Sequence, residues 1–116
     1  MSYWIELRSE GKHLGLREPH QEGGIISIPA ESSPILNVTY NYCRFYYDTI
    51  DAEDGIQWLR GKKAIDTVEK LAKAIATLGY HRSDDYWEVS SGNAGYALKI
   101  LLNFAFEFPD AIWFVD

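Results

Sequence analysis

The segment from Asn93 to Glu107 constrains the fold more than any other, because a helix there is apolar around most of its circumference. Pro109 fixes where that helix ends, since proline has no backbone N–H and cannot continue it. Only Lys99, Asn103 and Glu107 form a polar stripe. A chain of 116 residues covers such a helix only by placing it centrally or at a dimer interface. We expect a central helix in a monomer, with a homodimer as the alternative.

A second, amphipathic helix is predicted over residues 62–78, where apolar residues recur with helical spacing. Gly79 is placed to end it. Pairs of opposite charge four residues apart support its outer face. The predicted apolar stripe is Ile65, Val68, Leu71, Ala72, Ile75 and Leu78, and the predicted outer pairs are Asp66 with Lys70 and Glu69 with Lys73.

Three other segments have strand patterns. YWIELRS, residues 3–9, alternates apolar and polar side chains, and AIWFVD closes the chain after Pro109-Asp110. ILNVTYNY, residues 35–42, is rich in β-branched and aromatic residues, and CRFYYDTI after it is expected to form a helical turn or short helix. We predict a single α+β domain over residues 1–116. Its mostly antiparallel sheet has the 37–42 strand at the centre and two main helices packed on one face.

The sequence has the features of a soluble cytoplasmic protein. Cys43 is its only cysteine, so the chain has neither an internal disulfide nor a Cys-x-x-Cys pair for zinc. The N-terminus lacks a basic start followed by a long apolar run, and no stretch approaches the length of a membrane span. We therefore expect no export and no membrane association.

The charge balance argues against general nucleic-acid binding. The net charge is −6, whereas neutralising phosphates requires a surplus of lysine and arginine. Residues 45–59 carry acids without bases, and residues 60–73 carry mostly bases. If these segments stay separate in the fold, the protein has acidic faces and one basic helix edge. This edge is interpreted as a solvated surface, with a charge-complementary docking face as the alternative.

The run SSGNAG before the last helix has two interpretations. A serine and small residues at a helix start leave backbone N–H groups that attract anions. The simpler interpretation is that Ser90 or Ser91 caps the helix while Gly92 and Gly95 let it pass close to a strand. We favour the cap, because the run lacks the spacing of a dinucleotide fingerprint. The acids before it also oppose phosphate.

Other familiar motifs fail on inspection. GIQWLRGKK has five residues between its glycines where a Walker A loop needs four, and Lys63 where that loop needs Ser or Thr. DAEDGIQWLRGK has Lys62 where a calcium loop needs a bidentate glutamate. A metal site at His81, Asp84 and Asp85 has unspecific spacing. No signature surrounds Cys43, which we interpret as a packed thiol rather than a nucleophile. We expect no metal and no cofactor.

Polar side chains interrupt the apolar pattern at two places, and we predict that they share one site. Asn37, Thr39 and Asn41 alternate along the 35–42 strand, which puts three uncharged hydrogen-bonding groups on one face. The turn before the last helix supplies the others. An exposed sheet face or an internal polar network is the alternative. The predicted ligand- or partner-binding residues are Asn37, Thr39, Asn41, Tyr86, Trp87, Glu88 and Asn93.

NVTYNY, DDYWEVSSGNAGYALKILL and PDAIWFVD together resemble a family of small proteins from phages, prophages and bacteria. The family pattern is Ile-Thr-Tyr-Asn-Tyr, then Tyr-Trp-Glu-x-Thr-x-Gly-Asn-Ala and an Ala-Leu-rich helix, so Val38 and Ser90 are mild departures from it. The resemblance covers residues 36–116 and implies a common origin and fold more than a chemistry. It falls on Thr39, Tyr40, Asn41, Tyr42, Tyr86, Trp87, Glu88, Gly92, Asn93 and Ala94.

The functional hypothesis is a non-enzymatic binding protein of phage or mobile-element type. In that setting a small, acidic, aromatic-rich protein docks on a host macromolecule, for example as an anti-defence inhibitor, so we expect a protein partner. The alternative is a small polar-ligand-binding protein or enzyme. Its site would lie around Asn37, Asn41, Glu88 and the helix start at Asn93.

Overall fold

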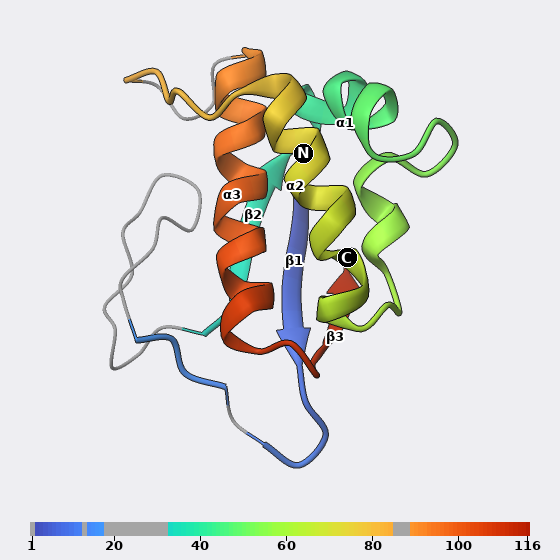
Figure 1. The fold of residues 1–116 in the computed structure, drawn as a ribbon, viewed down its shortest axis with the longest axis vertical. Helices are drawn as coiled ribbons and strands as arrows, with labels where there is room; N and C mark the ends of the chain where they lie inside the picture. Colours follow the sequence, from blue (N-terminus) through green and yellow to red (C-terminus); the bar gives the residue numbers. More distant parts are fainter. Residues whose placement is uncertain (1, 13, 18–32, 85–88) are drawn as a thin grey trace.

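The computed structural model of the protein describes residues 2–12, 14–17, 33–84 and 89–116. Strand β1 (Ser2–Arg8) lies between β2 (Ile35–Thr39) and β3 (Ile112–Val115), and both neighbours are antiparallel to it (Figure 1). The expectation that the 37–42 strand is central is therefore wrong. β2 and β3 each pair with one edge of β1, so β1 is the central strand.

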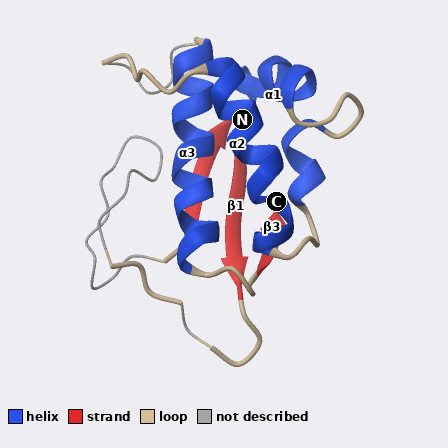
Figure 2. Ribbon diagram, in the orientation of Figure 1, coloured by secondary structure: helices blue, strands red, loops and turns tan. Residues whose placement is uncertain are grey.

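The helices confirm the α+β architecture. Helices α2 (Val68–Leu78) and α3 (Ser91–Glu107) cover one face of the sheet, and α1 (Cys43–Thr49) lies at one end of the molecule (Figures 1 and 2). Short 3₁₀ helices connect these elements. Their bounds are η1 (Tyr40–Tyr42), η2 (Gly55–Leu59) and η3 (Ala64–Thr67).

β1 has the burial pattern that its sequence predicts. Tyr3, Ile5 and Leu7 are buried against the helices, while Trp4 is 47% exposed and Arg8 is also exposed. The alternation arises because successive side chains of a strand point to opposite faces. The outer face of the sheet therefore carries the polar set of β1 together with Trp4.

β2 is shorter than predicted, because the chain turns into η1 after Thr39. The Thr39 hydroxyl accepts a hydrogen bond from the backbone N–H of Asn41 at 3.2 Å, which stabilises a helical turn in place of further strand. Consequently Tyr40 is 38% exposed, although continued strand alternation would place it on the face opposite to Asn41, together with the buried Leu36 and Val38. Tyr42, at the end of η1, is fully buried, and the predicted short helix follows as α1.

The predicted 62–78 helix is divided, with η3 preceding α2. A 3₁₀ turn has three residues per turn rather than 3.6, so the apolar stripe shifts. Ile65 is 50% exposed and Ala72 is exposed, while Thr67 is buried in the position expected for an apolar residue. Its hydroxyl donates to the Ala64 carbonyl at 2.7 Å and accepts from the Trp113 indole N–H at 2.9 Å. Burial is thus possible without an unsatisfied polar group.

The outer pairs of this helix are confirmed in part. Glu69 and Lys73 form an ion pair at 3.0 Å, but among the described residues Asp66 and Lys70 do not. The Lys70 ammonium lies instead over an aromatic ring on η2. Gly79 ends α2 with a φ of 77°, as predicted from its position.

α3 buries most of its circumference within one chain, through contacts with α2, η3, β2 and α1. Its two early glycines make a close approach possible. A Cβ added at Gly95 would lie 1.6 Å from the Gly79 carbonyl oxygen, and one at Gly92 would lie 2.3 Å from that of His81. The predicted partner of this approach was a strand, whereas the structure places there the chain that leaves α2. Phe106, near the other end of α3, is 60% exposed.

The edge of β3 that faces away from β1 is covered by the segment that joins η2 to η3. Gly61 donates to the Trp113 carbonyl at 2.9 Å, and the Trp113 N–H donates to the Lys62 carbonyl at 3.0 Å. The Arg60 guanidinium donates twice to the Val115 carbonyl, at 3.0 and 2.8 Å. The Trp113 indole is fully buried in the core, so backbone and side chain fix β3 together.

Candidate functional site

The structure describes four of the seven predicted site residues, and Tyr86, Trp87 and Glu88 lie outside its described residues. Asn37 is 8% exposed on β2, and its amide donates to the Ser2 hydroxyl at 2.7 Å and to the Tyr3 carbonyl at 3.4 Å. These bonds connect β2 to β1 across the sheet. In this position the amide supports the strand pairing.

Asn93 is fully buried and joins the start of α3 to the segment before it. Its side-chain oxygen accepts from the Ser83 N–H at 2.8 Å, and its amide donates to the Ser83 hydroxyl at 3.0 Å. Its own N–H donates to the Ser90 hydroxyl at 3.1 Å, so the cap interpretation of SSGNAG is confirmed with Ser90 as the capping residue. We call Asn93 with Ser83 and Ser90 the asparagine clasp.

The hydrogen bonds that Asn37 and Asn93 make with other described residues go to different parts of the chain. Those of Asn37 go to the beginning of β1, and those of Asn93 go to Ser83 and Ser90. Thr39 and Asn41 are linked to each other by the cap of η1. Of the four described residues, Asn41 alone is exposed, while Thr39 is 6% exposed.

Asn41 lies near several tyrosines at the end of the molecule where β2 passes into α1. Tyr40 and Tyr47 are 38% and 41% exposed on either side of it in sequence. The Tyr40 ring packs on the ring of Tyr3, with 4.4 Å between centroids. The Tyr3 hydroxyl lies 3.5 Å from the Sγ of Cys43, which is half-buried. We call the exposed set Tyr40, Asn41 and Tyr47 the tyrosine face.

The environment of Tyr3 keeps its phenol protonated. Burial raises the pKa of the Tyr3 hydroxyl far above its ordinary value, and the hydrogen bond with Cys43 raises it further. Unfavourable charge interactions with Cys43, Tyr47 and Tyr40 act in the same direction. Tyr3 therefore stays neutral near physiological pH and supports the tyrosine face by packing and hydrogen bonding.

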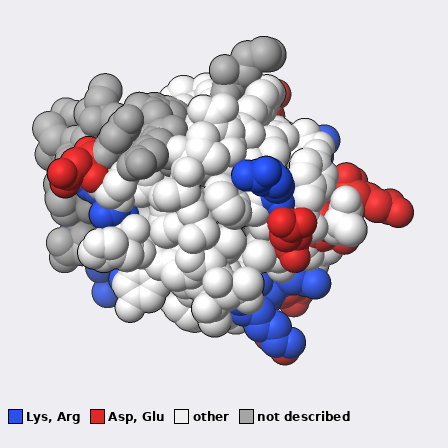
Figure 3. All heavy atoms as spheres, turned by 90° about the horizontal axis from the view of Figure 1, so that it is seen from above, with Lys and Arg blue, Asp and Glu red and all other residues white. Residues whose placement is uncertain are grey.

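Figure 3 shows the upper end of the molecule, where α1 lies, from above. Charged side chains of both signs stand beside a broad area formed by residues other than lysine, arginine, aspartate and glutamate. α1, which lies at this end in Figure 1, contributes Arg44 and Asp48 as its charged residues.

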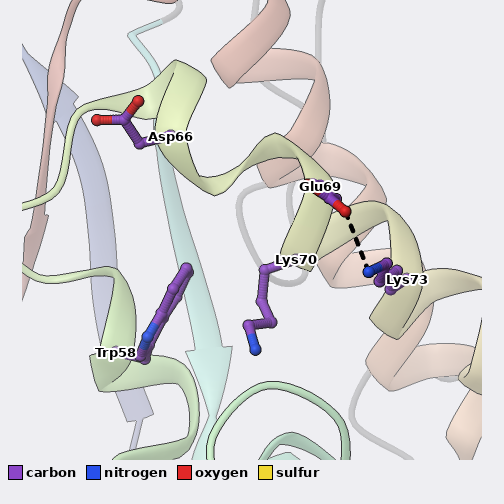
Figure 4. A pocket seen from close by; sticks show the side chains of 5 residues that line it. All are labelled: Trp58, Asp66, Glu69, Lys70 and Lys73. Carbon is purple, nitrogen blue, oxygen red and sulfur yellow. Dashed lines mark ion pairs between the residues drawn. The ribbon is translucent and has the colours of Figure 1, made fainter.

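A second surface feature is a hollow of about 300 Å³ between η2 and α2. Trp58 forms one wall, and Lys70 extends beside its indole (Figure 4). The ammonium groups of Lys62 and Lys70 lie 4.2 and 5.5 Å from the centroid of this indole. The remaining lining residues are Asp66, Glu69 and Lys73. Part of the predicted basic edge is therefore organised around one aromatic ring.

Sequence reasoning missed Tyr3 and Tyr47 at the first surface and Trp58 at the second. The adjacent tyrosines in CRFYYDTI were an available signal, because one points inward and its neighbour outward in a short helix. For Trp58, the available signal was an aromatic residue just before the basic segment. Neither signal shows which distant residues complete the surface.

Among the described residues, no group of three or more His, Cys, Asp and Glu side chains is arranged to hold a metal ion. Of the predicted metal candidates, Asp85 lies outside the described residues. None of the helices described here has the length and hydropathy needed to cross a bilayer.

In comparisons with known proteins, no family model, no curated protein and no solved structure matches this chain. The two surfaces therefore carry the functional interpretation by their own chemistry. One presents exposed tyrosines and an exposed amide. The other presents an indole with two ammonium groups above it.

Proposed function

We propose that this protein acts by non-enzymatic binding to a partner protein and that the tyrosine face is the docking surface. The supporting observation is that Tyr40 and Tyr47, both about two fifths exposed, lie with the exposed Asn41 at the end of the molecule where β2 passes into α1. The centres of protein interfaces are depleted in charge and enriched in tyrosine, and tyrosines are frequent hot spots.

The tyrosines are held in place before any partner binds. The Tyr40 ring rests on Tyr3, and the Tyr47 ring lies close to Gly55, where an added Cβ would be only 3.3 Å from it. The Asn41 backbone is fixed by Thr39. Aromatic side chains that are already ordered lose little conformational entropy on binding, so more of their contact energy contributes to affinity.

A host protein is the partner that fits both the surface and the motifs. The resemblance to small phage and prophage proteins supports a host target, and an anti-defence inhibitor is one form of such a protein. The alternative, a polar-ligand site or enzyme around Asn37, Asn41, Glu88 and Asn93, has weaker support. Asn37 and Asn93 are buried and donate or accept hydrogen bonds within the chain, whereas a ligand needs exposed groups.

The test compares captured proteins between variants. Tagged wild-type protein, Tyr40→Ser and Asn41→Ala are used to capture proteins from a host lysate, and quantitative mass spectrometry measures each captured protein. Phe106→Ser is the matched control, because Phe106 is 60% exposed near the end of α3 opposite to the tyrosine face. We expect one partner to fall by at least about tenfold with both test variants and to stay unchanged with the control.

Two further readings make the result decisive. The melting temperature of each variant separates lost binding from lost folding, and capture is expressed per folded molecule. If the test variants capture the same proteins at the same level as wild type, the tyrosine face is not the docking surface. If Phe106→Ser abolishes the capture instead, the docking surface lies at the other end of α3.

A further inference from the structure

The hollow beside Trp58 combines a flat aromatic wall with Lys70, which forms no ion pair within the described part of the chain. Within the described part of the chain, neither Lys62 nor Lys70 forms an ion pair, whereas Lys73 is paired with Glu69 at 3.0 Å. Lys62 also donates to the Trp58 carbonyl, which fixes it beside the ring. The Lys70 ammonium is farther from the indole than that of Lys62 and has a flexible stem.

An ammonium group over an aromatic face gains less interaction free energy than one bound to an anion. A cation–π contact uses the ring quadrupole and leaves the three N–H donors of Lys70 available for an anionic oxygen. Trp58 is half-buried, so part of its indole remains accessible from the hollow. A planar ring that enters the hollow and stacks on the part of the indole that borders it displaces the Lys70 ammonium sideways, toward an anionic group carried by that ring, while Lys62 stays outside the hollow.

We propose that this hollow binds a planar heteroaromatic ligand with one anionic group, the chemistry of a nucleoside monophosphate. Trp58 stacks on the ring and Lys70, with Lys62 nearby, binds the phosphate. A volume of about 300 Å³ is at the small end of ligand pockets and suits one ring system with its sugar. The inference is independent of the tyrosine face, which lies on other elements.

The acids of the hollow restrict the ligand further. Asp66 and Glu69 line the same hollow and accept hydrogen bonds from ring amino or N–H groups. Their negative charge opposes a second or third phosphate, and the net charge of −6 opposes a long polyanion. A free mononucleotide is therefore favoured over a nucleotide within single-stranded nucleic acid, although both offer a base and a phosphate.

The experiment follows the indole N–H signals of ¹⁵N-labelled full-length protein during titration with adenosine 5′-monophosphate. We expect one indole signal to shift saturably, and that signal to be the one missing from Trp58→Leu. Adenosine and inorganic phosphate, which each supply half of the chemistry, should bind at least about tenfold more weakly. Lys70→Gln should weaken binding by about tenfold, since it removes the charged contact to phosphate.

Lys99→Gln is the matched control, because the Lys99 ammonium also lies over a ring, 4.1 Å from the Tyr80 centroid, but outside the hollow. It should bind the nucleotide like wild type. No saturable shift up to about 10 mM nucleotide would overturn the proposal. Equal binding by Lys70→Gln and wild type, or equal weakening by Lys99→Gln, would also overturn it. Lys70→Gln decides the question if Trp58→Leu does not fold. Tighter binding of a short single-stranded oligonucleotide than of the mononucleotide would overturn the mononucleotide assignment.

Discussion

The asparagine clasp and the tyrosine face use the same side chain for opposite purposes. Asn93 is fully buried. Its side-chain oxygen accepts from the Ser83 N–H, and its side-chain nitrogen donates to the Ser83 hydroxyl. Asn41 is exposed, and within the described chain its backbone rather than its side chain is hydrogen-bonded. An amide in a distinctive motif can therefore fix a fold or face a partner, and its burial decides between the two.

The neighbouring residues explain this difference. Gly92 and Gly95 bring the backbone of α3 against the chain after α2, and this contact closes the space around Asn93. Asn41 instead follows Thr39 at the end of a strand, where the cap of η1 turns the chain along the surface. Small residues next to one amide let the backbone close over it, whereas the other amide stays at the surface beside the exposed Tyr40.

The largest expected effect is at the close approach that seals the clasp. Gly95→Ala places a Cβ where the Gly79 carbonyl oxygen lies, so α3 has to move away from the chain after α2. We expect the free energy of unfolding to fall by about 3 kcal/mol or more, measured by urea denaturation. Gly11→Ala is the control, since its φ is 70° but nothing lies within 4 Å, and it should cost about 1 kcal/mol. Equal losses would show that α3 adapts easily.

Asn93→Ala tests the clasp itself. It removes both bonds to Ser83 from a fully buried position, so unfolding should become easier by about 1–3 kcal/mol in the same assay. Asn103→Ala, at an exposed position of the same helix, should stay within about 0.5 kcal/mol of wild type. Partner capture per folded molecule should be unchanged by Asn93→Ala. A loss of capture without a loss of stability would move Asn93 from the clasp to the binding surface.

The pH dependence of stability tests the support under the tyrosine face. An unfolded tyrosine loses its proton near pH 10, whereas folded Tyr3 keeps it because its pKa is raised. Above about pH 10 the folded state therefore binds more protons than the unfolded state, and stability falls as pH rises, by at most about 1.4 kcal/mol per pH unit for one proton. Urea denaturation between about pH 9 and 11.5 should show a smaller decline for Tyr3→Phe. Parallel curves would refute this role of Tyr3.

The smallest effect on stability is expected at the face itself. Asn41→Ala keeps the backbone bond to Thr39, so its free energy of unfolding should stay within about 0.5 kcal/mol of wild type while partner capture falls. Thr39→Ala removes the cap and should cost about 1 kcal/mol by the same measurement. If Asn41→Ala destabilises the protein as much as Asn93→Ala, both amides have the same structural role.

Local patterns predicted the elements of this fold well, but not their order in space. Alternation located β1, and the apolar segment before Pro109 located α3, because burial of one face depends on neighbours in sequence. The central strand was predicted wrongly, because strand patterns do not show that the distant segments β2 and β3 both pair with β1. The shift of Ile65 to the surface depends on a 3₁₀ turn that apolar spacing does not reveal.

The candidate site was predictable only in part, for a related reason. Hydrogen-bonding residue types identify groups that need partners, but the partner can be the chain itself. Ser83 satisfies Asn93, and Ser2 binds Asn37, over separations of ten and thirty-five residues. The sequence also does not show that Tyr40 packs on Tyr3, a contact that forms only in the folded structure. The grouping of Tyr86, Trp87 and Glu88 with Asn37, Asn41 and Asn93 remains a prediction.

The covering of β3 also affects how the protein behaves in a crowded solution. An open strand offers alternating N–H and C=O groups to any other chain, and such edges start sheet-to-sheet aggregation. At β3 the N–H and C=O of Trp113 and the C=O of Val115, which would recruit a further strand, are already used by Lys62, Gly61 and the Arg60 guanidinium. Growth of the sheet in that direction requires this segment to detach first. An aromatic-rich protein with a β3 strand of four residues thus has a built-in barrier to polymerisation on that side.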